Sequence, residues 1–465
     1  MSYTRAATAT DDTPVTATPA PSATDGADSA PSVTIADRLR DHPRVQETIM
    51  AAARAAARTR SRSGVDSGAV LADGAAADAS IQTQAQTQTQ AQIETRAQAH
   101  AMSHAWLFTG PPGAGRSTTA LNFAAALLCE TPGAYGCGEC QACRTAMTGK
   151  HTDVVHVVPQ ELSIGVDFVR EKVVASAAKR PTVGAWRVVI FEDADRLTDG
   201  AANALLKTIE EPPAHTVIIL CAPSTDPEDF PQTLRSRCRH LYVPALPVET
   251  IVQMLVDEGA SENHARLAAH TSLRHVGRAR KLVNTPAIQQ RRAQAINLAE
   301  AIFHESGGFQ AVGQLVKAVE KEAKESYAEA DEAEKERLRN ALGMGAKGKG
   351  TQKSVSGGAG DLRELEKQQK KRQTRRLRDV LDLALVDLAG IYRDALMVKL
   401  GAEVDLTHPD FQPLASELAE HLDEAGLVEC QDAISHYREL LGFNVSPQIA
   451  FDGLVGCLRC AYRVH

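Results

Sequence analysis

The most informative stretch of this sequence is residues 105–128, which read AWLFTGPPGAGRSTTALNFAAALL. The first five residues are an apolar run of the kind that forms a buried strand, and the Ala- and Leu-rich end favours a helix. A loop rich in Gly and Pro joins the two. This strand–loop–helix order predicts an α/β fold whose first turn carries a candidate phosphate site.

The loop has the spacing of the phosphate-binding motif G-x-x-x-x-G-K-[ST], with an arginine in place of the lysine. Its candidate ligand residues are Gly110, Gly113, Gly115, Arg116 and Ser117. The glycines would let backbone N–H groups face a phosphate, and the serine hydroxyl would bind Mg²⁺. A forked guanidinium is a poor copy of a lysine ammonium. Nucleotide binding and a plain Gly-rich turn therefore both stay open, and efficient hydrolysis is not expected.

A second candidate is the apolar strand expected at 186–191, which is followed by Glu192 and Asp193. An active ATPase of this type ends the strand with Asp, which holds Mg²⁺ through water, and then Glu, which polarises the attacking water. Here the order is reversed, and the second acid is one methylene shorter than the geometry of a general base requires. Two interpretations remain open: a weakened nucleotide site, or two acids that end a strand in water.

Four cysteines crowd together just after the first helix, with the spacing C-x7-C-x2-C-x2-C: Cys129, Cys137, Cys140 and Cys143. Four thiolates close a tetrahedral Zn²⁺ shell without an open position, which indicates a structural site. An iron–sulfur cluster is the alternative, since four cysteines also suit it. A separate C-x-x-C pair, Cys457 and Cys460, has no second pair nearby and is interpreted as ordinary core residues.

Composition places limits on the whole chain. It has 465 residues, 43% of them hydrophobic, and 51 basic against 58 acidic residues give a formal net charge of −7. Such a chain does not attract nucleic acid through a global positive field. Apolar runs fall short of the roughly 18–20 residues that span a bilayer, and the N-terminus has no apolar segment typical of a secretory signal.

Further strands are expected at 154–158 and 216–220, so alternating strands and helices predict a parallel sheet covered on both faces. After Pro247 the pattern becomes helical throughout. One expected helix face carries apolar residues at helical spacing: Leu381, Leu385, Leu388, Tyr392 and Leu396. A run of seven Lys and Arg residues between Lys367 and Arg378 is interpreted as a solvated helix face rather than a DNA contact.

Low-complexity segments interrupt this pattern. Residues 1–33 are predicted to be a disordered tail, because they are too poor in large apolar side chains to offset the entropy of ordering. A helix is expected over 34–58, a flexible low-complexity insertion over 59–101, and a Gly-rich linker over 343–360.

Two more segments carry a resemblance to a known family. NALLKTIEEPP at 203–213 and LRSRC at 234–238 resemble hallmarks of the bacterial clamp-loader ATPase subunits, and so does a cysteine module directly after the phosphate-loop helix. The likeness covers about residues 102–245. Within that family, Arg116, the Glu192-Asp193 order and Gly277 in place of a sensor arginine resemble the delta-prime subunit of DNA polymerase III more than the gamma/tau motor subunits.

The resemblance implies an AAA+ α/β core at 102–245 with a zinc module at 129–143. The helix at 34–58 would belong to this core, and a helical lid at 246–285 and an all-α collar at 286–465 would follow. It implies a cytoplasmic stator that, together with gamma/tau and delta subunits, loads the sliding clamp onto primed DNA. Structural Zn²⁺ is implied, and ATP or ADP with Mg²⁺ stays open. The chain would lack efficient ATPase activity of its own and would belong to a DNA-directed DNA polymerase complex.

The resemblance also gives Arg237 a role, as an arginine finger that acts in trans on the nucleotide of a neighbouring subunit. The alternative is a residue in a surface salt bridge. Two other functions stay open for the whole chain. One is a gamma/tau-like active ATPase, and the other is a zinc-stabilised interaction module unrelated to replication.

Overall fold

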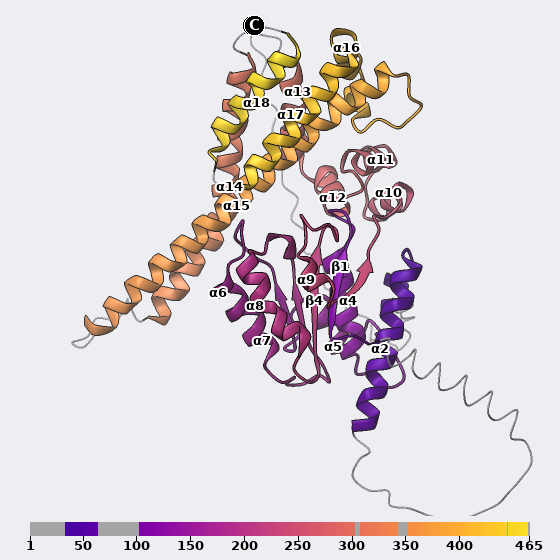
Figure 1. Cartoon of the computed structure of the whole chain (residues 1–465), viewed down its shortest axis with the longest axis vertical. Helices are drawn as coiled ribbons and strands as arrows, with labels where there is room; N and C mark the ends of the chain where they lie inside the picture. Colours follow the sequence, from indigo (N-terminus) through magenta and orange to yellow (C-terminus); the bar gives the residue numbers. More distant parts are fainter. Residues whose placement is uncertain (1–32, 64–101, 303–306, 343–351, 444, 464–465) are drawn as a thin grey trace, which may run out of the picture.

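The computed structural model describes residues 33–63, 102–302, 307–342, 352–443 and 445–463. A five-stranded sheet with its flanking helices forms an α/β region, and helices alone make up the rest (Figure 1). Within the described ranges, no helix is both long enough and apolar enough to cross a bilayer.

Two of the expected low-complexity segments lie mostly outside the described residues. The predicted disordered tail lies outside the described residues except for its last residue, Val33. The predicted insertion at 59–101 lies outside them from residue 64 onward, and its first residues belong to a helix.

The sheet is parallel throughout and has the strand order β2-β3-β4-β1-β5, which confirms the predicted sheet type. The central strands are apolar except at their ends, because both of their faces are buried. The three predicted additional strands are present, and a short edge strand was not predicted. The strands are β1 (Ala105–Thr109), β2 (Val154–Val157), β3 (Arg187–Phe191), β4 (Thr216–Ala222) and β5 (Arg239–Tyr242).

Alternating side chains of the strands contribute to two separate apolar cores, one on each face of the sheet. Trp106, Phe108 and Ile190 pack against the N-terminal helices and the cysteine segment, whereas Leu107 and Phe191 pack against the opposite helical layer. The helices of the first side are α1 (Ile35–Arg38), α2 (Pro43–Ser63), α4 (Arg116–Leu128) and α5 (Gln141–Met147). Those of the other side are α6 (Val166–Phe168), the π-helix η1 (Val169–Val174), α7 (Ala175–Ala177), α8 (Asp199–Glu210) and α9 (Gln232–Arg235). A 3₁₀ turn, η2 (Ala194–Arg196), follows β3.

The single helix expected over 34–58 is wrong, because the structure has two helices there. Thr34 caps α1 with a capping box, and α1 ends at Arg38. The second helix begins at Pro43, whose ring and missing N–H suit the first position of a helix and not its interior.

Two groups of helices follow the sheet. The three-helix cluster consists of α10 (Val248–Asp257), α11 (Glu262–Thr271) and α12 (Val276–Asn284) and has a small core of its own. The C-terminal helical region consists of α13 (Pro286–Ala301), α14 (Gly307–Ala341), α15 (Gln352–Lys399), η3 (Pro409–Phe411), α16 (Gln412–His421), α17 (Glu424–Gly442) and α18 (Pro447–Ala461).

Helices α14 and α15 form a long arm that passes beside the sheet and projects beyond it (Figure 1). Residues 343–351 of the predicted linker lie outside the described residues. The linker prediction is wrong from Gln352 to Gly360, which form the first turns of α15. Helix growth is cooperative, so a long helix rich in Lys, Gln, Arg and Leu extends through residues that would not start one.

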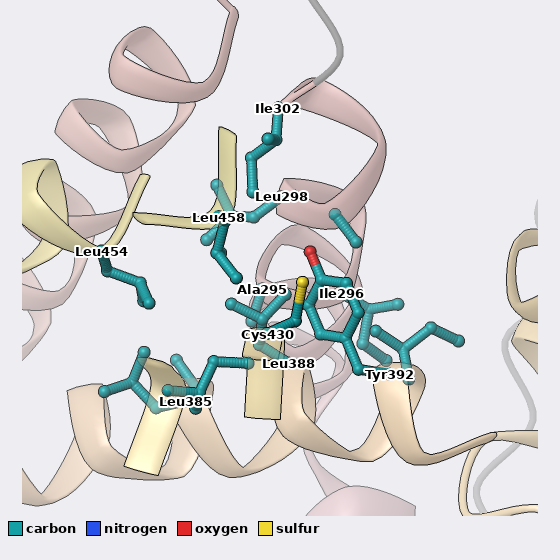
Figure 2. Packing of buried hydrophobic residues seen from close by; sticks show 14 of the residues in the cluster. Ala295, Ile296, Leu298, Ile302, Leu385, Leu388, Tyr392, Cys430, Leu454 and Leu458 are labelled. Carbon is teal, nitrogen blue, oxygen red and sulfur yellow. The ribbon is translucent and has the colours of Figure 1, made fainter. Parts of the chain in front are cut away.

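The core of the C-terminal helical region is built on the predicted face of α15. Leu385, Leu388 and Tyr392 are at most 1% exposed and pack against α13, α17 and α18 (Figure 2). The hydroxyl groups of Tyr392 and Tyr462 lie 2.6 Å apart, which satisfies both inside an apolar core. This core fixes the base of the arm.

Candidate functional site

The phosphate loop leads directly from β1 into α4, and glycine is required at two places in it. Gly113 has a φ of 82°, and a Cβ there would lie 2.2 Å from Cγ of His275. Gly115 has a φ of 86° and is the N-cap of α4. The three-helix cluster therefore rests directly on the loop, through the residue that caps α12.

A cavity of about 670 Å³ lies beside the loop, within the size range of small-ligand sites. Residues 113–119 line one wall, and Arg38, His42 and Gly277 line others. Nη1 of Arg116 is buried and has no hydrogen-bond partner among the described residues. An unsatisfied cationic donor is costly, so a phosphate oxygen fits this position. Four of the five predicted loop residues, Gly113, Gly115, Arg116 and Ser117, thus line a space that suits a phosphate-bearing ligand, and Gly110 does not line it.

The first acid after β3, Glu192, is hydrogen-bonded to other residues of this chain. Its backbone N–H donates to the carbonyl of Val157 at 3.0 Å, and its Oε1 accepts from Nε2 of His156 at 2.5 Å. Burial alone would raise the pKa of Glu192. Hydrogen bonds from His156 and Ser117 and the charge of Arg116 outweigh burial and hold it below the ordinary value of 4.5. The structure therefore places Glu192 next to the phosphate loop, with a basic partner already bound.

The second acid, Asp193, is held by a distant part of the sequence. Its backbone lies in the left-handed region, with a φ of 52°. The guanidinium of Arg375 on α15 pairs with its carboxylate and also donates to the carbonyl of Pro159. The Arg375 side chain is 15% exposed and that of Asp193 is 26% exposed, so solvent screens this pair only in part. Both members of the acid pair therefore have basic partners in cis.

Two further contacts join α15 to the α/β region beside this pair. Lys371 lies 2.7 Å from Glu161, and Arg196 lies 3.8 Å from Asp379. We call these two contacts and the Arg375–Asp193 pair the brace. The brace makes the acidic end of β3 an anchor for the arm.

The interpretation of the basic run as a solvated face is wrong for most of its C-terminal part. Arg372 pairs with Asp331 and Glu334 on α14, and Arg378 is buried and donates to carbonyls at the end of α17. Their partners lie tens of residues away in sequence. Local charge patterning therefore gave no signal for these pairs, or for the role of Arg375.

The four cysteines predicted as metal ligands come together at the end of α4 and the start of α5. Their sulfur atoms all lie within 4.8 Å of one another. Backbone N–H groups of Cys137, Cys140 and Cys143 point at neighbouring sulfurs at 3.3–3.4 Å, as they do in sites that hold thiolates. Burial would raise the pKa of Cys137, but hydrogen bonds from Thr131 and nearby N–H groups lower it to about 6. The donor set fits one tetrahedral metal ion.

The cysteine segment is covered by the first described residues of the chain. The N–H of Ile35 donates to the carbonyl of Gly136 at 3.0 Å. A Cβ on Gly136 would lie 2.6 Å from the Ile35 side chain, so only glycine allows this close approach. The other pair, Cys457 and Cys460, is exposed on α18, so its interpretation as core is wrong. The buried face of that helix is formed by Phe451, Leu454 and Leu458.

Arg237 lies apart from the phosphate loop, just after α9. Its Nε donates to Oε1 of Glu210 at 2.5 Å and its Nη1 to the carbonyl of Thr233 at 2.8 Å, and the side chain is 39% exposed. The structure thus brings the loop and the acid pair together and keeps the four cysteines and Arg237 as separate features.

Comparison with known proteins relates part of this chain to one family. Residues 85–247 match the family model described as DNA polymerase III, delta subunit. The delta-prime subunit of DNA polymerase III from Pseudomonas aeruginosa is 38% identical over 171 residues, which is 35% of this chain and 51% of that protein. The delta-prime subunit from Bacillus subtilis is 31% identical over 203 residues, which is 44% of this chain and 60% of that protein.

Other relatives are subunits of the same polymerase. The tau subunit from Bacillus subtilis is 35% identical over 170 residues, which is 34% of this chain and 29% of that protein. A solved gamma-subunit-related protein from Thermotoga maritima aligns with 80% of this chain and 100% of its own chain, at 18% identity and a TM-score of 0.37. The chain spans about half the length of the delta-prime relatives it matches.

Proposed function

We propose that this chain, which is delta-prime-like over residues 85–247, is a non-motor subunit of a DNA polymerase III clamp loader. The observation that carries the proposal is the engagement of the acid pair. His156 holds Glu192, and Arg375 holds Asp193. Hydrolysis of a nucleotide needs one acid for the metal and another group to orient water, and neither acid is free for this work.

The phosphate loop serves binding rather than turnover in this proposal. Backbone N–H groups of Gly113 and Gly115, those at the start of α4 and the unpaired donor of Arg116 would hold the phosphates of ATP or ADP. Ser117 would supply a hydroxyl to Mg²⁺, with Glu192 alongside. The bound cation would neutralise phosphate charge, while the chain's own residues orient the ligand.

The remaining architecture follows the same family pattern. We assign residues 102–245 to an AAA+ core, 246–285 to a lid and 286–465 to a collar that assembles with gamma/tau and delta subunits. The described contacts of His275 with the loop and of Arg278 with Asp387 support this division, because α12 contacts both neighbouring parts. The assembled loader, and not this chain alone, would engage the sliding clamp and primed DNA in the cytoplasm.

Arg237 would be the chain's contribution to catalysis at the site of a neighbouring subunit. Its partner Glu210 is 46% exposed, and exposed ion pairs of this kind contribute only about 0–1 kcal/mol. A γ-phosphate of a neighbouring subunit can therefore replace Glu210 at little cost. The guanidinium would neutralise charge that develops on the transferred phosphoryl group.

The four cysteines would hold structural Zn²⁺. All four positions of a tetrahedral shell are supplied by the chain, so no position remains for a substrate. The metal would stabilise the segment between α4 and α5, behind the phosphate loop.

The test uses the full chain assembled with tau/gamma and delta subunits, the clamp and primed DNA. Arg237→Ala is expected to lower single-turnover ATP hydrolysis at the neighbouring site by about 10³-fold, while assembly is retained. Arg235→Ala is the matched control, because this exposed arginine is the last residue of α9, two positions before Arg237, and is hydrogen-bonded to Gln232. Equal hydrolysis by the two variants would remove the trans role.

A gamma/tau-like active ATPase is the second candidate, favoured by the 35% identity to a tau subunit over 170 residues. Robust ATP turnover by the purified chain alone, stimulated by primed DNA, would establish it. Failure of the chain to co-purify with any loader subunit would instead support an interaction module outside replication.

A further inference from the structure

A small cavity of about 160 Å³ lies where the three-helix cluster meets the C-terminal helical region. Helices α12, α13 and α15 surround it. It is separate from the phosphate-loop cavity, although His275 and Gly277 line both. Its charged lining is strongly unbalanced: five cations, Arg278, Lys281, Arg291, Arg292 and Arg376, and one acid, Asp387.

The ion pairs around the cavity do not neutralise these cations. Arg278 pairs with Asp387, and Arg292 binds both carboxylate oxygens of Asp410 at 2.6 and 2.7 Å. Arg291 and Arg376 share a single carboxylate, that of Glu322. Lys281, which lines the cavity and is exposed, has no ion pair in the part of the chain that the structure describes. Five positive charges therefore meet three negative ones.

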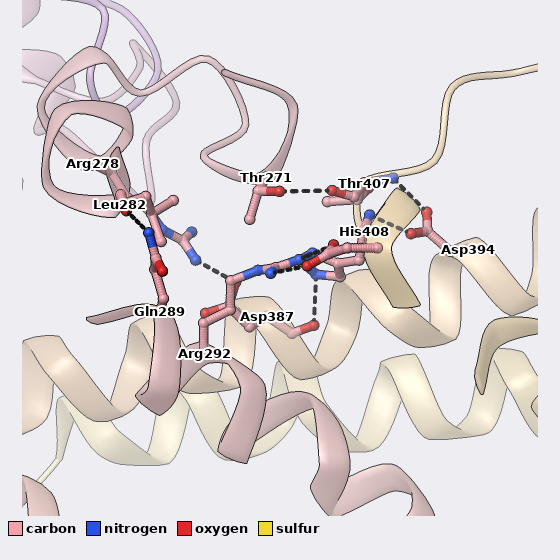
Figure 3. Close-up of polar contacts among 10 residues, drawn as sticks. Thr271, Arg278, Leu282, Gln289, Arg292, Asp387, Asp394, Thr407 and His408 are labelled. Carbon is pink, nitrogen blue, oxygen red and sulfur yellow. Dashed lines mark hydrogen bonds and ion pairs between the residues drawn. The ribbon is translucent and has the colours of Figure 1, made fainter. Parts of the chain in front are cut away.

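Arg292 supplies an independent sign that an acceptor is missing. Its side chain is 8% exposed, and its Nε is buried without a hydrogen-bond partner among the described residues. Its Nη2 donates to Nδ1 of His408 at 2.9 Å, and Nε2 of His408 donates to the carbonyl of Asp387 at 3.0 Å. Figure 3 shows this chain of contacts across α13, α15 and the loop before η3. Because the imidazole both accepts and donates, it is neutral.

A small anion with several acceptor oxygens meets these requirements. The cavity is below the roughly 300–1,000 Å³ of sites for larger organic ligands, and charge-assisted N–H donors surround it. We propose that this cavity binds a phosphate group, held by Lys281, Arg376 and the free Nε of Arg292. The bound phosphate would join the three-helix cluster to the C-terminal helical region.

The test is a calorimetric titration of the full chain with inorganic phosphate, in chloride buffer at constant ionic strength. Lys281→Gln is expected to raise the dissociation constant at least about tenfold, since it removes one charge-assisted contact. Lys281→Arg should restore most of the affinity. Because Lys281 is exposed and outside the apolar core, these variants keep the fold.

Two controls separate this cavity from other sites. Arg266→Gln removes the same charge from an exposed ion pair within the three-helix cluster and should leave phosphate binding unchanged. Arg116→Gln removes the donor of the phosphate loop and so identifies any phosphate that binds there; the part of the signal that Lys281→Gln abolishes should persist in this variant. The proposal is overturned if wild-type protein binds no phosphate. It is also overturned if the signal is lost with Arg116→Gln and retained with Lys281→Gln.

The source of the phosphate group is decided by competition. A short single-stranded oligonucleotide with a 5′-phosphate is added to the phosphate-loaded chain, with its dephosphorylated form as the control. Displacement by the 5′-phosphorylated strand alone supports a nucleic-acid end as the ligand. Displacement by neither strand supports free phosphate.

Discussion

The phosphate loop and the acidic end of β3 lie against each other, yet the chain uses them differently. The loop keeps a ligand-sized cavity and a cationic donor without a partner, on Arg116. The acids Glu192 and Asp193 are both held by basic side chains of the same molecule. The comparison teaches that two neighbouring parts of one region can have different roles: the loop borders a cavity, whereas the acidic end of β3 anchors the arm.

The largest loss of stability is expected from removing a ligand of the four-cysteine cluster, which lies behind the phosphate loop. Cys140→Ser should release the metal and lower the free energy of unfolding by several kcal/mol, because a metal site of four ligands contributes folding energy directly. Metal content by atomic absorption, together with urea unfolding, measures this. Cys457→Ser, at an exposed cysteine outside the cluster, is the control and should behave as wild type. Metal-free wild-type protein would contradict the prediction.

The brace is expected to give the next largest effect. Arg375→Ala should cost about 2 kcal/mol, since it leaves the partly buried Asp193 without its charged partner. A double-mutant cycle with Asp193→Asn isolates the pair, and a coupling energy near zero would show that the contact does not stabilise the attachment of the arm. Arg339→Ala, in an exposed pair on the arm, is the matched control.

A smaller effect is expected from restoring the consensus residue of the loop. Arg116→Lys should raise the affinity for ADP up to about tenfold, because a compact ammonium fits the phosphates better. It should not produce ATP turnover, because the acids remain engaged. Binding of a fluorescent ADP and a phosphate-release assay separate the two outcomes. Turnover by this variant would mean that the acid pair is still competent.

The smallest effect concerns acid stability. The pKa of Glu192 is below 4.5 in the folded chain, so its ionised form stabilises the fold above that pH. This contribution is lost as the pH falls through the folded value. The stability difference between wild type and Glu192→Gln should therefore be constant near neutral pH and shrink below pH 4.5. A stability difference that grows as the pH falls would contradict this prediction.

Local sequence signals located most of the α/β region. Strand β1, the loop and α4 were all predicted from residues 105–128, because an apolar run, glycines and an Ala-rich helix follow one another directly. The four cysteines were also identified as one cluster, since short spacing forces their proximity. Strand β5 was missed because Arg239–Tyr242 carries charged and exposed residues and lies at the edge of the sheet.

The features that the sequence did not predict depend on contacts between residues far apart in the chain. Arg375 lies 182 residues from Asp193, and nothing in the local pattern of α15 distinguishes it from a neighbouring solvated arginine. The cations around the smaller cavity come from three helices that meet only after folding. Such sites depend on the packing of elements, which periodicity and spacing do not specify.

The segment from Ile35 to His42 has two neighbours at once. One end of it hydrogen-bonds to the cysteine loop at Gly136, and Arg38, Leu39 and His42 line the cavity beside the phosphate loop. One short stretch of backbone thus lies between the four-cysteine cluster and the cavity beside the phosphate loop. A change at the four cysteines that shifts this segment would therefore also move a wall of the cavity beside the phosphate loop.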